Sequence, residues 1–282
     1  MAISVGDVKK LREKTGAGPV DCKKALEESS GDFSKAEKLL KEKGLAAVEK
    51  RADRATKEGK IFVKAENGMA AVAEITTETD FVAKNPEFIA LGEKITRLML
   101  EKQLSEADAS LPGLVAELAT KIGENMSLKR IKLIKAEPGE YLTHYIHGDG
   151  AIGVVVKLSA DKPKVLQNPA VQDFAHNLAL HIAAFSPIAV EASQLDPTFI
   201  QEQEEIFRKQ METDETLKGK PAQALENILK GKMKKYLAEI CLLDQGYVKD
   251  DKLTVGQALG ECGKKAGAVL KISGCEYFKV GQ

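Results

Sequence analysis

Histidines are the first side chains to consider for catalysis or metal binding in this chain of 282 residues. His144 and His147 lie in a strand-like segment, where a spacing of three points them to opposite faces. His176 and His181 lie in a helical segment, about 140° apart around the helix axis. Neither pair is arranged to hold a metal ion, and neither a G-x-S-x-G nor an H-E-x-x-H motif occurs. The pattern favours a binding or regulatory protein over an enzyme, with no metal and no cofactor.

Two glycine-containing segments resemble nucleotide-binding motifs without completing them. Residues 16–21 begin like a dinucleotide-binding fingerprint, but the third glycine is missing and the segment follows a predicted helix. Residues 258–265 resemble a phosphate-binding loop, yet Ala258 stands where that motif has glycine and Lys265 where it has serine or threonine. We therefore expect no direct nucleotide binding.

A third segment, 76–86, is a polar and acidic connection that nevertheless contains two adjacent apolar residues, Phe81 and Val82. Such side chains usually pack beneath their own loop and anchor it, and composition alone favours that role. The alternative is an exposed apolar finger that enters a pocket of a partner protein.

Overall composition excludes several classes of protein. Hydrophobic residues make up 43% and charged residues 30%, as in ordinary globular proteins. Lysine plus arginine and aspartate plus glutamate both number 42, so the formal net charge is zero. A general nucleic-acid binder takes most of its affinity from neutralising phosphates and usually carries a positive charge, so that class is disfavoured.

The sequence also predicts where the protein works. The longest uncharged run, 174–190, contains polar residues and falls short of the ~20 apolar residues of a membrane helix. No basic region followed by an apolar run, as in a signal peptide, occurs at the N-terminus. The four cysteines are widely spread and form no C-x-x-C pair. We expect a reduced cytoplasmic protein that does not enter a membrane.

Residues 1–44 predict a compact three-helix module that docks on a partner. Pro19 is placed to open the second helix, Asp32 to cap the third, and Gly44 to end it. Residues 45–59 are charged, rich in alanine and weakly patterned, which predicts a linker.

Residues 60–187 contain an internal duplication. An Asn-Gly turn at 67–68 and an Asp-Gly turn at 149–150 each join two strand-like runs, and each hairpin is followed by a polar loop and an amphipathic helix. The predicted strands cover 60–65, 70–75, 128–136, 141–146 and 151–158, and the predicted helices cover 86–101, 113–121 and 169–185. The fold class is therefore α+β, with two related lobes that each hold a small antiparallel sheet covered by helices.

Residues 196–240 change to a long helical periodicity. The break at 219–221 predicts an antiparallel helical hairpin that projects from the lobes. The tail predicts a loop at 242–248, a helix at 254–262 and a closing strand at 268–272. The predicted domains are 1–44, the linker 45–59, a first lobe 60–138, a second lobe 139–195, the hairpin 196–240 and a C-terminal module 241–282 that closes the second lobe.

The segment with Phe81 is one of a series of short motifs along the whole chain. The series comprises LREKTGAG at 11–18, DCKKAL at 21–26, TDFVA at 79–83, KIGEN at 121–125, HG at 147–148, HIAA at 181–184 and TVGQ at 254–257. In this order and spacing, the chain resembles the elongation factor Ts family, the guanine-nucleotide exchange factors of elongation factor Tu.

The resemblance implies how the chain would bind elongation factor Tu in its GDP-bound and nucleotide-free forms. The N-terminal module, similar to ubiquitin-associated domains, would dock on the nucleotide-binding domain. The 80–81 turn would enter near the magnesium and phosphate site, the end of the 113–121 helix would join it, and the second lobe would face the other end of the partner. The partner-binding residues implied are Asp21, Lys23, Thr79, Asp80, Phe81, Val82, Ile122, Gly123 and His147.

The implied function is promotion of GDP release, so that GTP can reload during translation elongation. The resemblance associates the hairpin with self-association, which leaves a homodimer open. The alternative is a scaffold or chaperone-like binder of a translation GTPase that causes no exchange. A thiol enzyme using Cys22 or Cys241 is a third class, for which no paired base is evident.

Several of these residues also have simpler structural explanations. Ile122 is expected in a core more often than at a contact, and Gly123 is expected to cap a helix. His181 is expected to be a buried histidine with satisfied hydrogen bonds. Lys23 and Asp21 are equally well explained as a solvated helix residue and a local ion-pair partner.

Overall fold

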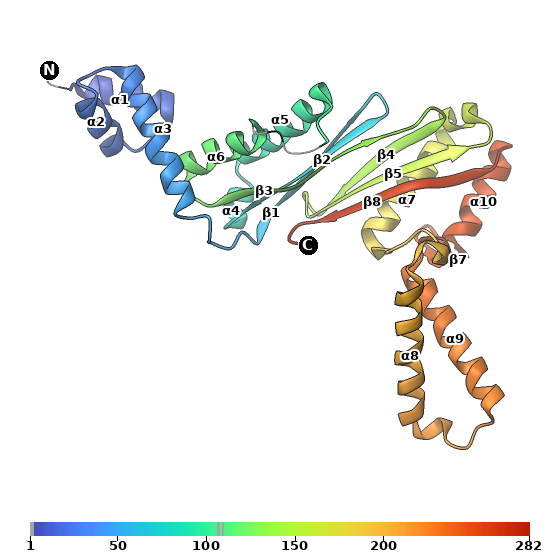
Figure 1. Ribbon diagram of the computed structural model, residues 1–282. Helices are drawn as coiled ribbons and strands as arrows, with labels where there is room; N and C mark the ends of the chain where they lie inside the picture. The colour runs from blue at the N-terminus through green and yellow to red at the C-terminus, as the bar shows by residue number, and fades with distance from the viewer. Residues whose placement is uncertain (1–2, 106–107, 109) are drawn as a thin grey trace. The chain divides into compact units, whose positions relative to one another are not determined.

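The computed structural model describes residues 3–105, 108 and 110–282, and its ribbon is drawn in Figure 1. The chain forms two compact units. Unit 1 holds Met1–Lys135, Ile146–Gly153 and Phe278–Gln282, and unit 2 holds Ala136–Tyr145 and Val154–Tyr277. Each unit combines helices with antiparallel strands, which confirms the α+β fold class.

The three predicted N-terminal helices are present. They are α1 (Val5–Thr15), α2 (Pro19–Glu28) and α3 (Phe33–Glu49). Asp32 caps α3 by accepting a hydrogen bond from the Lys35 amide, and Pro19 is the first residue of α2, as expected. Their shared core is small and includes Leu11, Cys22 and Leu26.

The predicted end of the third helix at Gly44 is wrong, because α3 continues to Glu49. Glycine in a helix interior is unfavourable by roughly 1 kcal/mol relative to alanine, so a glycine at this position predicts a helix end. At Gly44, the absence of a side chain allows close packing of two helices. A Cβ at Gly44 would lie 2.2 Å from Cγ2 of Thr120, so only glycine lets α3 approach α6 (Ser110–Ile122) this closely.

The first sheet has the strand order β1-β2-β3, with every neighbouring pair antiparallel. The strands are β1 (Glu58–Glu66), β2 (Met69–Thr77) and β3 (Met126–Lys135). Asn67 and Gly68, between β1 and β2, both have positive φ, at 51° and 73°. This is the backbone that the Asn-Gly pair predicts for a tight hairpin turn.

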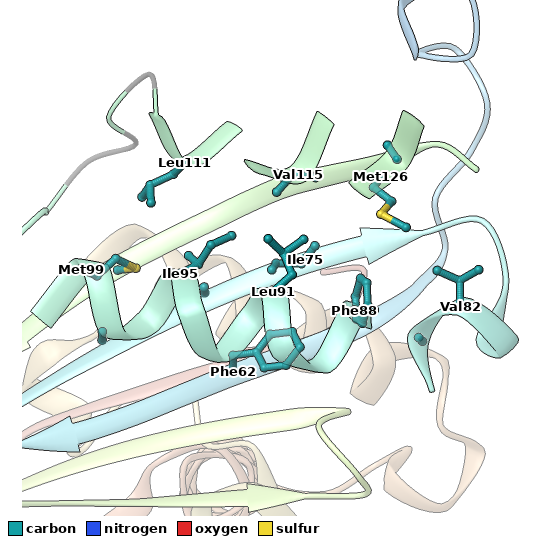
Figure 2. Close-up of a cluster of buried hydrophobic side chains, with 14 of the residues drawn as sticks. Phe62, Ile75, Val82, Phe88, Leu91, Ile95, Met99, Leu111, Val115 and Met126 are labelled. Carbon is teal, nitrogen blue, oxygen red and sulfur yellow. The ribbon is translucent and has the colours of Figure 1, made fainter. Parts of the chain in front are cut away.

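The core of unit 1 lies between this sheet and two helices, α5 (Pro86–Lys102) and α6. Figure 2 shows Phe88, Leu91 and Ile95 of α5 directed at the sheet. An amphipathic helix recovers its stability from burying one apolar face, and α5 does so along its whole length. This packed layer is the rigid base on which the 78–84 segment sits.

We expect Gly92→Ala to destabilise the protein by about 1–3 kcal/mol, the usual cost of overpacking a core. A Cβ on Gly92 would lie 2.3 Å from ring atoms of Phe62, which is itself held in the core. Gly113→Ala, in α6, is the matched control, because a Cβ there meets nothing within 4 Å and alanine favours a helix. Urea denaturation of both variants measures the effect. Equal shifts of the two midpoints would contradict this account of Gly92.

A buried carboxylate, Glu74 of β2, anchors the C-terminal residues of the chain within unit 1. Its side chain is 1% exposed and accepts hydrogen bonds from Arg130 Nε at 2.6 Å and from the Gly281 amide at 2.9 Å. Arg130 also donates to the Lys279 carbonyl at 3.0 Å, and its guanidinium lies over the ring of Phe278. One ion pair thus holds both β3 and the chain end against the central strand.

The second sheet has the strand order β4-β5-β8 and is accompanied by helix α7 (Pro169–Phe185) and helix α10 (Val255–Ala266). Its strands are β4 (Glu140–His147), β5 (Ile152–Ala160) and β8 (Leu270–Lys279). The closing strand is longer than predicted, since β8 continues to Lys279. The predicted loop at 242–248 is partly wrong, because it contains β6 (Gly246–Tyr247), which pairs with β7 (Asp250–Thr254).

The predicted helical hairpin is confirmed as α8 (Pro197–Thr213) and α9 (Ala222–Ile240), which project from the rest of unit 2 in Figure 1. Tyr236 of α9 contacts Phe199 and Phe207 of α8, with ring centroids 6.4 and 5.8 Å apart. These aromatic contacts close the helix pair on itself.

Unit 2 contains the buried histidine that the sequence predicts. His181 is fully buried, and its Nδ1 accepts a hydrogen bond from the Val248 amide at 3.2 Å. Its Nε2 lies 3.0 Å from Oε1 of Gln245, whose Nε2 donates to the Glu239 carbonyl. The ring is therefore neutral and carries its proton on Nε2. Burial lowers the pKa of His181, outweighing the opposite effect of the Gln245 hydrogen bond.

We expect the protein to lose stability as the pH falls below about 6.5, where an unfolded histidine takes up a proton. A lowered pKa in the folded state means that the unfolded chain binds more protons in that window, so the free energy of unfolding rises with pH there. Urea denaturation at several pH values measures this slope. His181→Asn retains an acceptor for the Val248 amide and should flatten the slope; an unchanged slope would contradict the assignment.

Candidate functional site

The turn that follows β2 carries a large apolar side chain, that of Phe81, which is exposed to solvent. Residues Asp80–Ala83 form a short helix, α4, where the sequence predicted only a loop. Phe81 is 82% exposed, whereas Val82 is 7% exposed and points into the core, as Figure 2 shows. The packing role favoured from composition is therefore right for Val82 and wrong for Phe81.

Glu124, just beyond α6, braces this turn from one side. Its Oε2 accepts hydrogen bonds from Thr77 Oγ1 at 3.0 Å and from the Thr79 amide at 3.1 Å, and its Oε1 accepts from Thr79 Oγ1 at 2.8 Å. Thr79 Oγ1 in turn accepts a hydrogen bond from the Val82 amide, which caps α4. The helix that presents Phe81 is thus tied to the end of α6.

A second carboxylate, that of Glu78, connects the same two segments in the opposite direction. Glu78 Oε1 accepts a hydrogen bond from the Asn125 amide at 2.6 Å and lies 3.4 Å from the guanidinium of Arg54. The Asn125 side chain donates to the carbonyls of Ala52 and Arg54, at 3.2 and 2.8 Å. Three segments that are distant in the sequence therefore meet behind the Phe81 turn: 52–54, 77–79 and 124–125.

Ile122 and Gly123 lie directly before this brace. Ile122 ends α6 and is half-buried against the core, in agreement with the structural explanation. Gly123 adopts a left-handed backbone, with φ of 88°, and its amide donates to the Ala119 carbonyl, so it terminates the helix as expected. Gly123 is exposed, which leaves its backbone open to a partner.

Asp80 stands beside Phe81 with its charge already paired. Lys84 Nζ donates to the Asp80 carboxylate at 2.7 Å, and this hydrogen bond lowers the pKa of the carboxyl below its ordinary value. Asp80 is therefore ionised at neutral pH, within an exposed pair that a partner can compete for.

The remaining predicted site residues lie on other elements of unit 1. Asp21 and Lys23 are exposed on α2 of the N-terminal module, where Lys23 lies 3.8 Å from Glu27 in an i,i+4 ion pair. His147 ends β4 and is exposed, next to a turn whose Gly148 has φ of 60°. The structure thus brings Thr79–Val82 together with 122–123, and places the other three residues elsewhere.

The residues that brace the turn were not predicted as site residues. Glu124 and Asn125 lie in the motif at 121–125, and Thr77 and Lys84 lie in the segment 76–86, without being marked there as site residues. The signal for them in the sequence is composition, because charged and amide side chains follow directly after a strand and a helix that are otherwise apolar. Sequence alone does not reveal that these two segments meet, because the contact spans 45 residues of chain.

Among residues 3–105, 108 and 110–282, no three or more histidine, cysteine, aspartate or glutamate residues gather where they could hold a metal ion. None of the described helices has the length and apolar character needed to cross a membrane.

Comparison with known proteins gives one consistent result. The sequence model of the family described as "Elongation factor TS" matches residues 78–282. A protein named Elongation factor Ts from Treponema denticola is 48% identical over 281 residues, covering 100% of this chain and 99% of the relative. Its namesake from Treponema pallidum is 45% identical over 292 residues, with coverage of 100% and 99%. The one from Borreliella afzelii is 42% identical over 280 residues, covering 99% of each chain.

An exposed apolar side chain on a braced turn is a feature expected of an α+β factor that binds a partner. Given the matches along its whole length, this chain belongs to the elongation factor Ts family. The resemblance drawn from the short motifs is thereby confirmed.

Proposed function

We propose that this chain binds elongation factor Tu, in its GDP-bound and nucleotide-free forms, and promotes the release of GDP. The exposure of Phe81 on a turn fastened to the core of unit 1 is the observation that carries the proposal. A rigid apolar side chain in water gains free energy by entering a pocket and loses little conformational entropy in doing so. The Asp80–Phe81 turn inserts near the magnesium and phosphate site of the partner.

Nucleotide exchange of this kind is negative coupling between two ligands of one protein. A factor that weakens GDP binding must itself be weakened by GDP, by the same free energy. The factor need not touch the nucleotide; it need only prefer a state of elongation factor Tu whose magnesium and phosphate contacts are disrupted.

Burial of Phe81 contributes about 1.5–3 kcal/mol, a factor of roughly 10–150 in an equilibrium constant. An acceleration larger than this factor requires binding free energy from the rest of the interface. In this proposal, the N-terminal module supplies part of that binding energy through Asp21 and Lys23, which are exposed on α2. Ile122 and Gly123 contact the partner beside Phe81, and His147 contacts it elsewhere.

Release of fluorescent GDP from purified elongation factor Tu tests the proposal. A catalytic amount of this protein, with excess unlabelled GDP, should accelerate release over many turnovers. Binding without acceleration would instead support the alternative of a scaffold or chaperone-like binder. Analytical ultracentrifugation of the free protein tests separately whether the hairpin forms a homodimer.

A further inference from the structure

The four-residue helix that presents Phe81 cannot hold its own conformation. Isolated helices shorter than about 12–15 residues are marginal in water, so α4 depends on contacts outside itself. Val82 and Ala83 supply contacts beneath it, because both are buried in the core. The direction in which Phe81 points also requires a lateral contact, and Glu124 is the side chain that makes it.

Around Glu124, each of the donors described above is paired with an acceptor. One carboxylate receives three donors: the hydroxyls of Thr77 and Thr79 and the amide of Thr79. Thr79 gives its only hydroxyl proton to Glu124, so a lone pair of its oxygen stays available to the Val82 amide. Thr77 is fully buried, and its hydroxyl would lose this acceptor if Glu124 were removed.

Glu124 connects the two exposed parts of the candidate site. It follows Gly123 directly in sequence, and its carboxylate reaches the residue that caps the Phe81 helix. The reciprocal hydrogen bond, which the Asn125 amide donates to Glu78, prevents the two segments from sliding past one another. Since both of its oxygens are engaged with Thr77 and Thr79, the Glu124 carboxylate acts on its own chain.

We propose that Glu124 is a positioning residue for nucleotide exchange, which holds the Phe81 turn at the orientation needed to enter the partner. This inference rests on the proposed function of the Asp80–Phe81 turn. Misdirecting the turn affects the step in which Phe81 inserts, while docking by the N-terminal module continues. The maximal rate of catalysed GDP release is therefore affected more than the concentration of elongation factor Tu·GDP that gives half of it.

The test compares Glu124→Ala, Glu124→Gln and Thr79→Val in the full-length protein. Glutamine keeps an acceptor oxygen for the Thr77 hydroxyl and the Thr79 amide, and its NH2 can donate to the second lone pair of Thr79 Oγ1. We expect Glu124→Ala to lower the maximal rate about tenfold, equivalent to ~1.4 kcal/mol, and Glu124→Gln to retain most of it. Glu101→Gln, an exposed change at the end of α5, is the charge control.

A double-mutant cycle tests whether Glu124 acts through Thr79. If the two share one contact, Glu124→Ala and Thr79→Val together should slow release little more than either alone. Strictly additive losses would overturn the positioning role. Thermal melting of each variant separates a local effect from unfolding. Thr79→Val, which replaces the hydroxyl by a methyl group and so removes both the bond to Glu124 and the cap of α4, provides the test if Glu124→Ala melts below the assay temperature.

The remaining outcomes separate this inference from the proposed function. Wild-type rates for Glu124→Ala, with Phe81→Ala slow, would overturn the role of Glu124 and leave the turn in place. Wild-type rates for Phe81→Ala would overturn the proposed action of the turn itself. If Glu124→Gln were as slow as Glu124→Ala, the carboxylate would act through its charge on the partner, and the positioning role would be wrong.

Discussion

Replacing Phe81 by alanine is expected to slow catalysed GDP release by roughly 10–150-fold, the range that corresponds to losing the burial of one large apolar side chain. The fold should be unaffected, because Phe81 is 82% exposed and the substitution leaves no cavity. A stopped-flow measurement of fluorescent GDP release gives the rate, and a urea titration gives the free energy of unfolding.

Its neighbour provides an informative contrast. Val82→Ala should lower the stability by about 1–2 kcal/mol, since Val82 belongs to the buried cluster. It retains the Phe81 ring and should affect exchange less than Phe81→Ala does. Val269→Ala, an exposed apolar change in unit 2, should alter neither property. If Phe81→Ala exchanged nucleotide at the wild-type rate, the interaction of this side chain with elongation factor Tu would have to be abandoned.

The largest expected loss of stability follows from breaking the buried ion pair of β2. Arg130→Met should lower the free energy of unfolding by about 3 kcal/mol, because Glu74, 1% exposed, would lose its cationic partner. Arg130 itself is 37% exposed at its side chain, so water can enter part of the space that it vacates. The Gly281 amide would still donate a hydrogen bond to the Glu74 carboxylate.

Two further variants separate the ion pair from the loss of a long side chain. Glu74→Leu combined with Arg130→Met should recover most of the stability, since no buried charge is left unpaired. Arg208→Met removes a similar side chain from exposed ion pairs with Glu204 and Glu226 and should cost about 1 kcal/mol or less. A double variant as unstable as Arg130→Met would show that contacts of the guanidinium with the chain end, and not its charge, are what matter.

Features with a local cause were predictable from the sequence. Asn-Gly at 67–68 requires positive φ at both positions, and both have it. Pro169 and Phe185 are the first and last residues of α7, as predicted, because a proline opens the helix and its apolar periodicity ends there. Such signals depend on neighbours in the chain, so they can be recognised without knowledge of the fold.

Features caused by contacts between distant segments were not predictable. Gly44 carries the signal of a helix end, yet α3 continues through it. The close approach of Thr120 leaves no room for a Cβ at this position, which explains the glycine. Strand β6, with two residues, is too short to show a strand period, so its sequence predicts only part of the loop at 242–248. The division of the chain into the predicted domains remains a prediction, including the boundaries of the linker and the C-terminal module.

The candidate site divides along the same line. The residues of the turn, their unusual composition and the family to which the chain belongs are all contained in short stretches of the sequence. The sequence does not show that Phe81 is exposed while its neighbour Val82 is buried, because a four-residue helix is too short to have a periodicity that would distinguish them. The core beneath β2 accepts Val82, and Glu124, brought in from 45 residues away along the chain, holds the helix so that Phe81 faces outward.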